Sequence, residues 1–399
     1  MASSGLSIET IDVGLTANLE LSTTTTVIDC MTSPDPIVSD WHRKQRRARV
    51  MSAIIAVAVG ATLLAPLAWF SRPPPRPDPT PGHPLPGGAF VAYSPGYRVS
   101  FFGLERMHPF DIRKYDRIAA GLVERGLVGE NDFAVAAPVG DDALAAVHDA
   151  DYLASLHTPE ALGRALELNL PDLFTQGAIE RRVLDPFQSA VGGTILAARG
   201  ARDHGFGINL GGGYHHARPE LGHGFCIYSD VALAIHTLRS EGLTGPILIV
   251  DTDAHQGDGS HAFFTDDPTV FSFSMHQGNI FPIPKLQGDL DVPLRSGTDD
   301  DAFLWALEQR LPELLEQLEP VYVIHVAGAD VLVDDPLAGL ALTPKGLVNR
   351  DLFVARTVRE QNIPLLHLLA GGYGPSAAMS QEASVAAMLE LVRTDTTED

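Results

Sequence analysis

Five short and almost wholly apolar segments recur along the chain, and longer segments with helical periodicity lie between them. The apolar segments predict strands at residues 207–210, 247–250, 270–274, 321–326 and 364–369. Helices are predicted at 113–124, 186–199, 230–240, 300–316 and 344–361. Strands without polar alternation are buried on both faces, and their alternation with helices is typical of a parallel sheet covered on both sides. The sequence therefore predicts an α/β fold.

One of these strands runs directly into the sequence Asp251-Thr-Asp253-Ala-His255. Ligands of open α/β sheets bind at the carboxyl ends of strands, and residues two apart in extended backbone point the same way. Asp253 and His255 can therefore reach one point, and a carboxylate oxygen with an imidazole nitrogen suits a first-row metal such as zinc. Asp251, two residues earlier, lies on the same side of the strand and further from its carboxyl end.

The third ligand is expected at the end of another strand. Residues 321–329 are apolar or small apart from His325, and Asp330 follows them. An Asp253–His255–Asp330 set leaves a coordination position open, as catalytic zinc sites do. His325 is the rival candidate, but its place inside the strand favours a core histidine.

Two further loops supply groups for proton transfer. Three glycines and a tyrosine precede His215 and His216, and Tyr373 stands among glycines after the last predicted strand. Glycines let the backbone approach a ligand closely, and paired histidines can bracket it. These residues are candidates for proton transfer at the metal.

The N-terminal quarter differs in composition from the rest. Residues 1–40 hold no Lys or Arg and are predicted to be disordered; five basic residues lie between 43 and 49, and residues 50–70 carry no charge. About 20 apolar residues cross a bilayer, so 50–70 predict a transmembrane helix, with a buried globular helix as the alternative. The Pro-rich residues 71–88 predict a spacer, so the domains are 1–49, 50–70, 71–88 and a catalytic domain at 89–399.

Basic residues before the span place the N-terminus in the cytoplasm and the catalytic domain outside, unless the true start of the chain lies elsewhere. The net charge is −22, from 28 basic and 50 acidic residues. That charge argues against nucleic acid as a partner and attracts cationic groups, such as a lysine-rich peptide or a polyamine. Two cysteines give neither a disulfide framework nor a cysteine-based zinc site. The oligomeric state does not follow from the sequence.

The motifs together resemble the zinc-dependent deacetylases of the histone deacetylase superfamily, from about residue 90 to residue 390. Three details resemble the class IV branch and its bacterial-type members: Met107-His-Pro-Phe-Asp111 with Lys114 behind it, the run from Gly222 to Asp230, and Asp253-Ala-His-Gln256. Most other branches carry a second histidine where this chain has Gln256. The resemblance implies an arginase/deacetylase-like parallel sheet flanked by helices, here preceded by one transmembrane helix.

The resemblance also implies a role for each matching residue. Asp253, His255 and Asp330 would bind zinc. His215 and His216 would be tandem histidines supported by Asp251 and Asp258 respectively, with His216 the general base and His215 mainly electrostatic. Tyr373 would donate to the oxyanion, and Gly224, Phe225 and Phe281 would line an acyl-lysine tunnel. A monovalent cation, usually potassium, would bind to Asp251, to main-chain oxygens of Asp253 and His255, and to Ser274 with Met275.

These roles imply a hydrolase that removes acetyl or longer acyl groups from lysine side chains by metal-activated water. Two departures remove no catalytic atom: residues 325–327 lack the polar residue common before the Ala-Gly pair, and Ala370 leaves one glycine fewer before Tyr373. An acetylpolyamine amidohydrolase is an alternative, although no gatekeeper carboxylate is evident. Another is a catalytically silent, membrane-tethered binding protein. Arginase-like ureohydrolases need bridging carboxylates for two manganese ions, and Gly257 and Leu332 stand where these would be.

Overall fold

The computed structural model describes residues 77–100, 105, 108–168 and 176–395, all of which fall in one compact unit. The predicted disordered segment and the predicted membrane span at 50–70 lie outside the described residues. Among the helices that are described, none has the length and apolar character needed to cross a bilayer.

The centre of the fold is a seven-stranded sheet with the order β1-β2-β7-β6-β3-β4-β5, in which every neighbouring pair is parallel. The prediction of a parallel α/β sheet is therefore confirmed. The strands are β1 (Ala89–Ala92), β2 (Phe206–Asn209), β3 (Ile247–Asp251), β4 (Val270–Gln277), β5 (Leu290–Leu294), β6 (Tyr322–Val326) and β7 (Leu365–Leu368).

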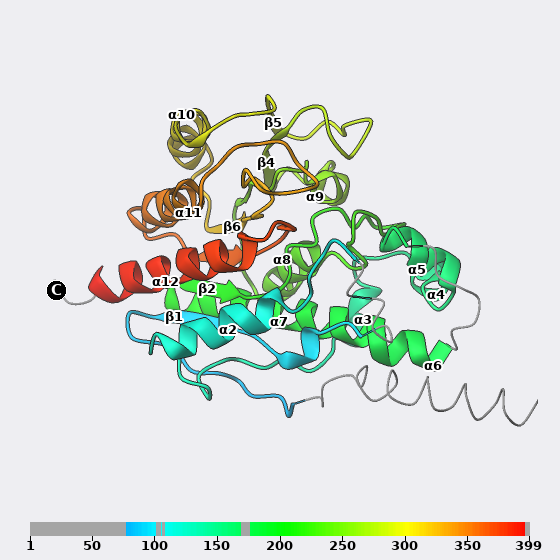
Figure 1. Cartoon of the computed structure of the whole chain (residues 1–399). Coiled ribbons are helices and arrows are strands. Elements are labelled where there is room, and N and C mark those ends of the chain that lie inside the picture. Colours follow the sequence, from blue (N-terminus) through cyan, green and yellow to red (C-terminus); the bar gives the residue numbers. More distant parts are fainter. Residues whose placement is uncertain (1–76, 101–104, 106–107, 169–175, 396–399) are drawn as a thin grey trace, which may run out of the picture. The chain divides into compact units, whose positions relative to one another are not determined.

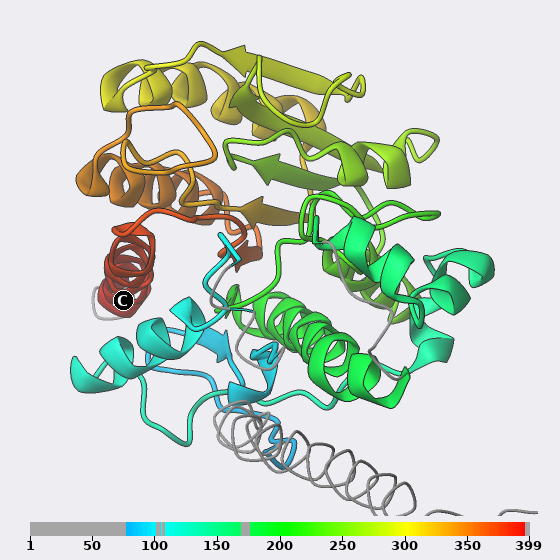
Figure 2. The same ribbon diagram turned by 45° about the vertical axis from the view of Figure 1, so that its right-hand side comes forward.

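Helices cover both faces of this sheet (Figures 1 and 2). Alternate strand residues face opposite sides of the sheet: Leu248 and Val250 of β3 join one apolar cluster, whereas Ile247 and Ile249 join another. The longer helices are α2 (Lys114–Glu124), α7 (Asp185–His204), α8 (Asp230–Ser240), α10 (Asp300–Leu318), α11 (Pro344–Arg359) and α12 (Ala377–Asp395). Five of these six helices were predicted from their periodicity, and α12 was not. Two of the five begin at a capping side chain, because Ser229 Oγ accepts from the N–H of Ala232 and Thr343 Oγ1 from that of Gly346.

Shorter elements escaped the sequence prediction. They are η1 (Pro95–Tyr97), α3 (Asp141–Leu144), α4 (Ala150–Ser155), α5 (Pro159–Ala165), α6 (Gln176–Ile179), η3 (Glu180–Leu184) and α9 (Asp258–Phe264). Segments this short show no clear periodicity. The edge strands β1 and β5 were also missed. Pro293 in β5 argues against a central strand but is tolerated at a sheet edge, where its missing N–H costs no ladder bond.

Part of the predicted Pro-rich spacer at 71–88 packs against the catalytic domain. The main-chain N–H of Thr80 donates to Val135 O (2.9 Å), and Leu85 is buried in the core. The domain therefore includes residues before Ala89. The prolines around these positions lack an N–H. Thr80 and Leu85 supply main-chain donors there, and Leu85 also supplies an apolar side chain.

Candidate active site

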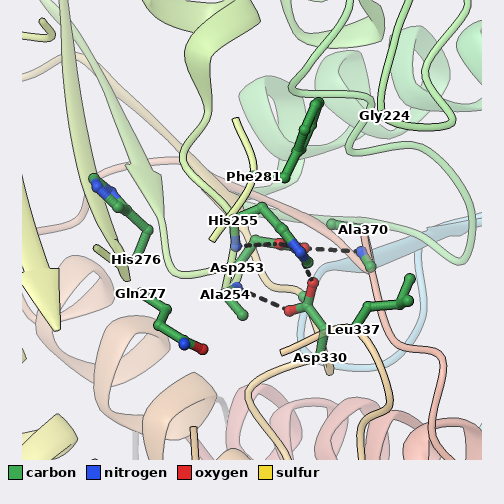
Figure 3. Close-up of polar contacts among 12 residues, drawn as sticks. Gly224, Asp253, Ala254, His255, His276, Gln277, Phe281, Asp330, Leu337 and Ala370 are labelled. Carbon is green, nitrogen blue, oxygen red and sulfur yellow. Dashed lines mark hydrogen bonds and ion pairs between the residues drawn. The ribbon is translucent and has the colours of Figure 1, made fainter. Parts of the chain in front are cut away.

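Three predicted metal ligands converge at the carboxyl end of the sheet (Figure 3). Asp253 and His255 follow β3 and Asp330 follows β6, and one ligand atom from each lies within 4.8 Å of the others. His255 Nδ1 is 2.8 Å from Asp330 Oδ2 and 3.3 Å from Asp253 Oδ1. All three side chains are buried. The spacing that predicted them therefore holds in three dimensions.

Main-chain donors fix the orientation of both carboxylates. Asp253 Oδ1 accepts from the N–H of His255 (2.9 Å) and Oδ2 from that of Gly371 (3.0 Å), while Asp330 Oδ1 accepts from the N–H of Ala254 (2.8 Å). The chain segments after β3, β6 and β7 are thus tied together at the two carboxylates.

The donor set fits a divalent cation. Burial, together with the charge of Asp253, raises the pKa of Asp330 to about 7. A cation with oxygen and nitrogen ligands would offset that repulsion. Glycines leave room beside the carboxylates: a Cβ at Gly371 would lie 2.6 Å from both Asp253 Oδ2 and Asp330 Oδ2.

Two histidine–aspartate pairs lie next to this triad. His215 Nδ1 is 2.6 Å from Asp251 Oδ2, and His216 Nδ1 is 2.7 Å from Asp258 Oδ1. The two imidazole rings are buried, with centroids 4.1 Å apart. Because each Nδ1 faces a carboxylate, each Nε2 is the nitrogen left for chemistry.

The two histidines differ in charge. Burial lowers the pKa of His216, the charge of His215 lowers it further, and it reaches about 3 despite Asp258. Burial would also lower the pKa of His215, but the carboxylates of Asp251 and Asp253 outweigh burial and raise it to about 9. At neutral pH His216 is therefore the imidazole able to accept a proton.

Arg218 supports the His216 pair, and the sequence analysis did not identify it. Its Nη2 donates to Asp258 Oδ2 at 2.5 Å and its Nε at 3.1 Å. Burial alone would raise the pKa of Asp258, but bonds with His216 and the nearby His223 hold it well below its ordinary value. Asp258 is thus an anion that fixes the ring of His216.

Tyr373 faces the triad from the loop after β7. Its ring lies 6.4 Å from the His255 ring and 5.7 Å from the Phe225 ring. Its N–H donates to Asp335 Oδ2 (2.8 Å), another residue that the sequence analysis missed. Burial and the nearby carboxylates raise the pKa of Tyr373 well above its ordinary value, so the hydroxyl keeps its proton.

Lys114 supports the same loop through its main-chain oxygens. Its buried Nζ donates to the main-chain oxygens of Ala370 (2.8 Å) and Gly371 (2.7 Å). Ala370 adopts a φ of 48°, the left-handed conformation that favours glycine. The loop therefore keeps its shape at some cost in strain.

A cavity of about 250 Å³ leads to the triad. Phe225 and Phe281 line it as predicted, and a Cβ at Gly224 would lie 2.9 Å from Phe281 Cε1, so only glycine fits there. The lining also includes residues that the sequence analysis did not place there: His108, Pro109, Glu167, Leu168 and Leu337. Glu167, which is exposed, adds a carboxylate to this lining.

The residues predicted for potassium lie on the neighbouring strands β3 and β4. Ser274 is opposite Asp251 in the β3–β4 pairing, and both Ser274 and Met275 are buried. Ser274 Oγ is also 2.9 Å from His276 Nδ1. His325, the rival metal ligand, is a core residue whose Nε2 is 2.9 Å from Thr252 Oγ1.

Known proteins share this arrangement of sequence and fold. The histone deacetylase domain family matches residues 108–389. Histone deacetylase 2 of Arabidopsis thaliana is 38% identical over 291 residues, which cover 72% of this chain and 75% of that protein. Acetoin utilization protein AcuC of Bacillus subtilis (strain 168) is 31% identical over 271 residues, covering 63% and 68%. The solved structure of the HDA15 HD domain, at 22% identity, covers 77% of this chain and 89% of its own with a TM-score of 0.62, and so shares the fold. This chain therefore belongs to the histone deacetylase family.

Proposed function

We propose that the protein is a zinc-dependent amidohydrolase that removes acetyl or longer acyl groups from lysine side chains. The observation that carries this proposal is the convergence of the Asp253–His255–Asp330 triad, two histidine–aspartate pairs and Tyr373 at the end of one aromatic-walled cavity.

Asp253, His255 and Asp330 would hold the zinc ion. When bound, zinc supplies a Lewis acid for the amide carbonyl and lowers the pKa of a water molecule. His216, neutral and fixed by Asp258, takes the proton from the attacking water through Nε2 and returns it to the leaving amine nitrogen. His215, charged beside Asp251, stabilises the negative charge that develops. Tyr373 donates its hydroxyl proton in a hydrogen bond to the carbonyl oxygen as that oxygen becomes an anion.

The side walls favour a narrow, extended acyl-lysine chain. Phe225, Phe281 and Gly224 all line the cavity, so an alkyl stem meets two aromatic rings and no bulky side chain at Gly224. Burying such a stem contributes about 0.8 kcal/mol per CH₂. The relatives named as histone deacetylases agree with a lysine substrate.

An acetylpolyamine is the second candidate substrate. Glu167 is an exposed carboxylate on the cavity lining, and the chain carries a net charge of −22. Both features attract a substrate whose amines beyond the scissile amide are protonated.

Two further features of the proposal rest on the sequence. Residues 50–70 would form one membrane-spanning helix, with the N-terminus in the cytoplasm and the catalytic domain outside. A potassium ion would bind near Asp251, Ser274 and Met275, where a buried carboxylate lies opposite a serine. Both are tested directly, by protease protection of membrane vesicles and by potassium dependence of activity.

A substrate panel tests the activity. The full chain, purified in detergent with zinc restored, would be offered acetyl-lysine and myristoyl-lysine peptides and acetylated polyamines. We expect turnover of a lysine peptide. Turnover of acetylpolyamines alone would move the assignment to the second candidate, and inertness on every amide despite one bound zinc would indicate a silent binding protein.

A further inference from the structure

Gln256 follows the proposed zinc ligand His255, and none of the catalytic steps uses it. Its side chain is buried. Its Nε2 donates to Leu286 O (2.6 Å), and its Oε1 accepts from the N–H of Leu286 (3.0 Å). The same Nε2 donates its second hydrogen to Asp291 Oδ1 (2.8 Å). Both amide hydrogens and the amide oxygen are therefore used.

These bonds tether the segment that carries Phe281. Residues 281–288 lead from the cavity wall to β5, and Gln256 holds Leu286 near the end of this segment. A second tether follows, because the N–H of Gly288 donates to Asp291 Oδ2 (2.9 Å). Within the segment, Lys285 Nζ donates to Phe281 O (3.1 Å). The position of Phe281 is thus connected to Gln256 by a short run of chain.

Hydrogen bonds hold the far end of this segment, where few side chains are buried. Pro282 is buried next to Phe281, but Ile283 is 77% exposed, and beyond it the segment is anchored mainly through Leu286 and Gly288. Phe281 packs edge-on against His216, with ring centroids 5.0 Å apart, and is itself partly exposed. A movement of the segment would therefore change the width of the cavity next to the proposed base.

We propose that Gln256 is a positioning residue that sets the width of the acyl tunnel by fixing residues 281–288. A glutamine suits this role because its amide presents a donor and an acceptor side by side, matching the C=O and N–H of one residue in extended pairing. A histidine at this place cannot offer that pair from one edge, and an asparagine is shorter by one CH₂. The inference rests on the proposed function, since it assigns a width to that tunnel.

Hydrogen exchange of the full chain tests the tether without any turnover. Gln256→Ala and the volume-conserving Gln256→Met should speed exchange of the Leu286 and Gly288 amides, read in peptides covering 281–288, by about tenfold or more. Leu286 loses its acceptor directly, and the Gly288–Asp291 bond then opens with the freed segment. Peptides covering β6 should be unchanged. Gln188→Ala, a glutamine on α7 that is not part of the cavity lining, is the matched control. Unchanged exchange in both Gln256 variants would overturn the proposal.

Kinetics tests the effect on width. With acetyl- and benzoyl-lysine peptides, the ratio of kcat/KM for acetyl to that for benzoyl should fall about tenfold in Gln256→Met, because a mobile wall admits a wider group. The metal content should equal that of the wild type. If the wild type hydrolyses neither of these peptides nor a myristoyl-lysine peptide, the proposed function fails whatever the exchange data show. If the wild type is active and the ratio is unchanged in the variant, the positioning inference fails alone.

Discussion

Removal of the Tyr373 hydroxyl offers the sharpest test of the site. In Tyr373→Phe the ring keeps its packing against Phe225 (5.7 Å between centroids) and Phe110 (6.0 Å), and its N–H still donates to Asp335. The variant therefore loses one donor and creates no cavity, so its thermal stability should stay close to that of the wild type.

The size of the expected loss follows from the role of that donor. Removal of one oxyanion donor costs about 2.7–4 kcal/mol of transition-state stabilisation, or about 10²–10³ in kcat. The KM should change little, because the hydroxyl acts on charge that develops only in the transition state. Zinc content should remain one per chain, since Tyr373 is not among the three ligand residues.

The assay compares kcat and KM on an acyl-lysine peptide, with zinc measured in the same samples. Tyr322→Phe is the control, because its buried hydroxyl donates to Ala198 O (2.8 Å) away from the cavity. That variant should lose about 1 kcal/mol of stability and keep its kcat. A loss in Tyr373→Phe of less than about fivefold, at full zinc content, would refute the assignment of Tyr373 as the oxyanion donor.

Three further predictions concern the metal, the tyrosine loop and acid stability. Asp330→Asn should weaken zinc binding, measured by competition with a chelator. The loss should exceed the 10–100-fold, roughly, that removal of a residue behind a ligand costs. The wild type should bind one equivalent of zinc, and two equivalents would favour a binuclear site. Asp335→Ala should lower kcat about tenfold at unchanged zinc affinity, because the N–H groups of Tyr373 and Gly374 lose their acceptor; a change in zinc affinity instead would contradict this role. Burial lowers the pKa of His367 to about 4, below its unfolded value of about 6.5, so the folded state resists protonation and stability is lost as the pH falls from about 6.5 to about 4. His367→Gln should therefore lose less stability than the wild type in urea unfolding between pH 7 and pH 5, and equal losses would show that His367 does not contribute.

The sequence alone determined the fold class and the metal triad, because both depend on local patterns. Apolar segments without alternation identify strands buried on two faces, and a spacing of two residues in extended backbone aligns Asp253 with His255. Parallel strands then bring Asp330 to the same edge of the sheet as that pair. The tandem histidines and Tyr373 were predicted because they lie in glycine-rich segments that follow predicted strands.

The sequence did not identify the residues that orient these groups. Arg218 fixes Asp258, Asp335 holds the backbone of Tyr373, and Glu167 reaches the cavity from a separate helix–loop segment. Gln256 was singled out as unusual, but its pairing with Leu286, thirty residues away, was not foreseen. No periodicity encodes which distant main-chain groups a side chain will meet.

The difference has one physical origin. Local sequence determines where strands end and which side chains share a face, since these depend on backbone geometry over a few residues. Partners across the fold are decided only when packed helices and loops bring buried donors to buried acceptors, and each such group must find a partner once water is excluded. Catalytic groups could therefore be found from the sequence, whereas the contacts that hold them in place required the tertiary structure.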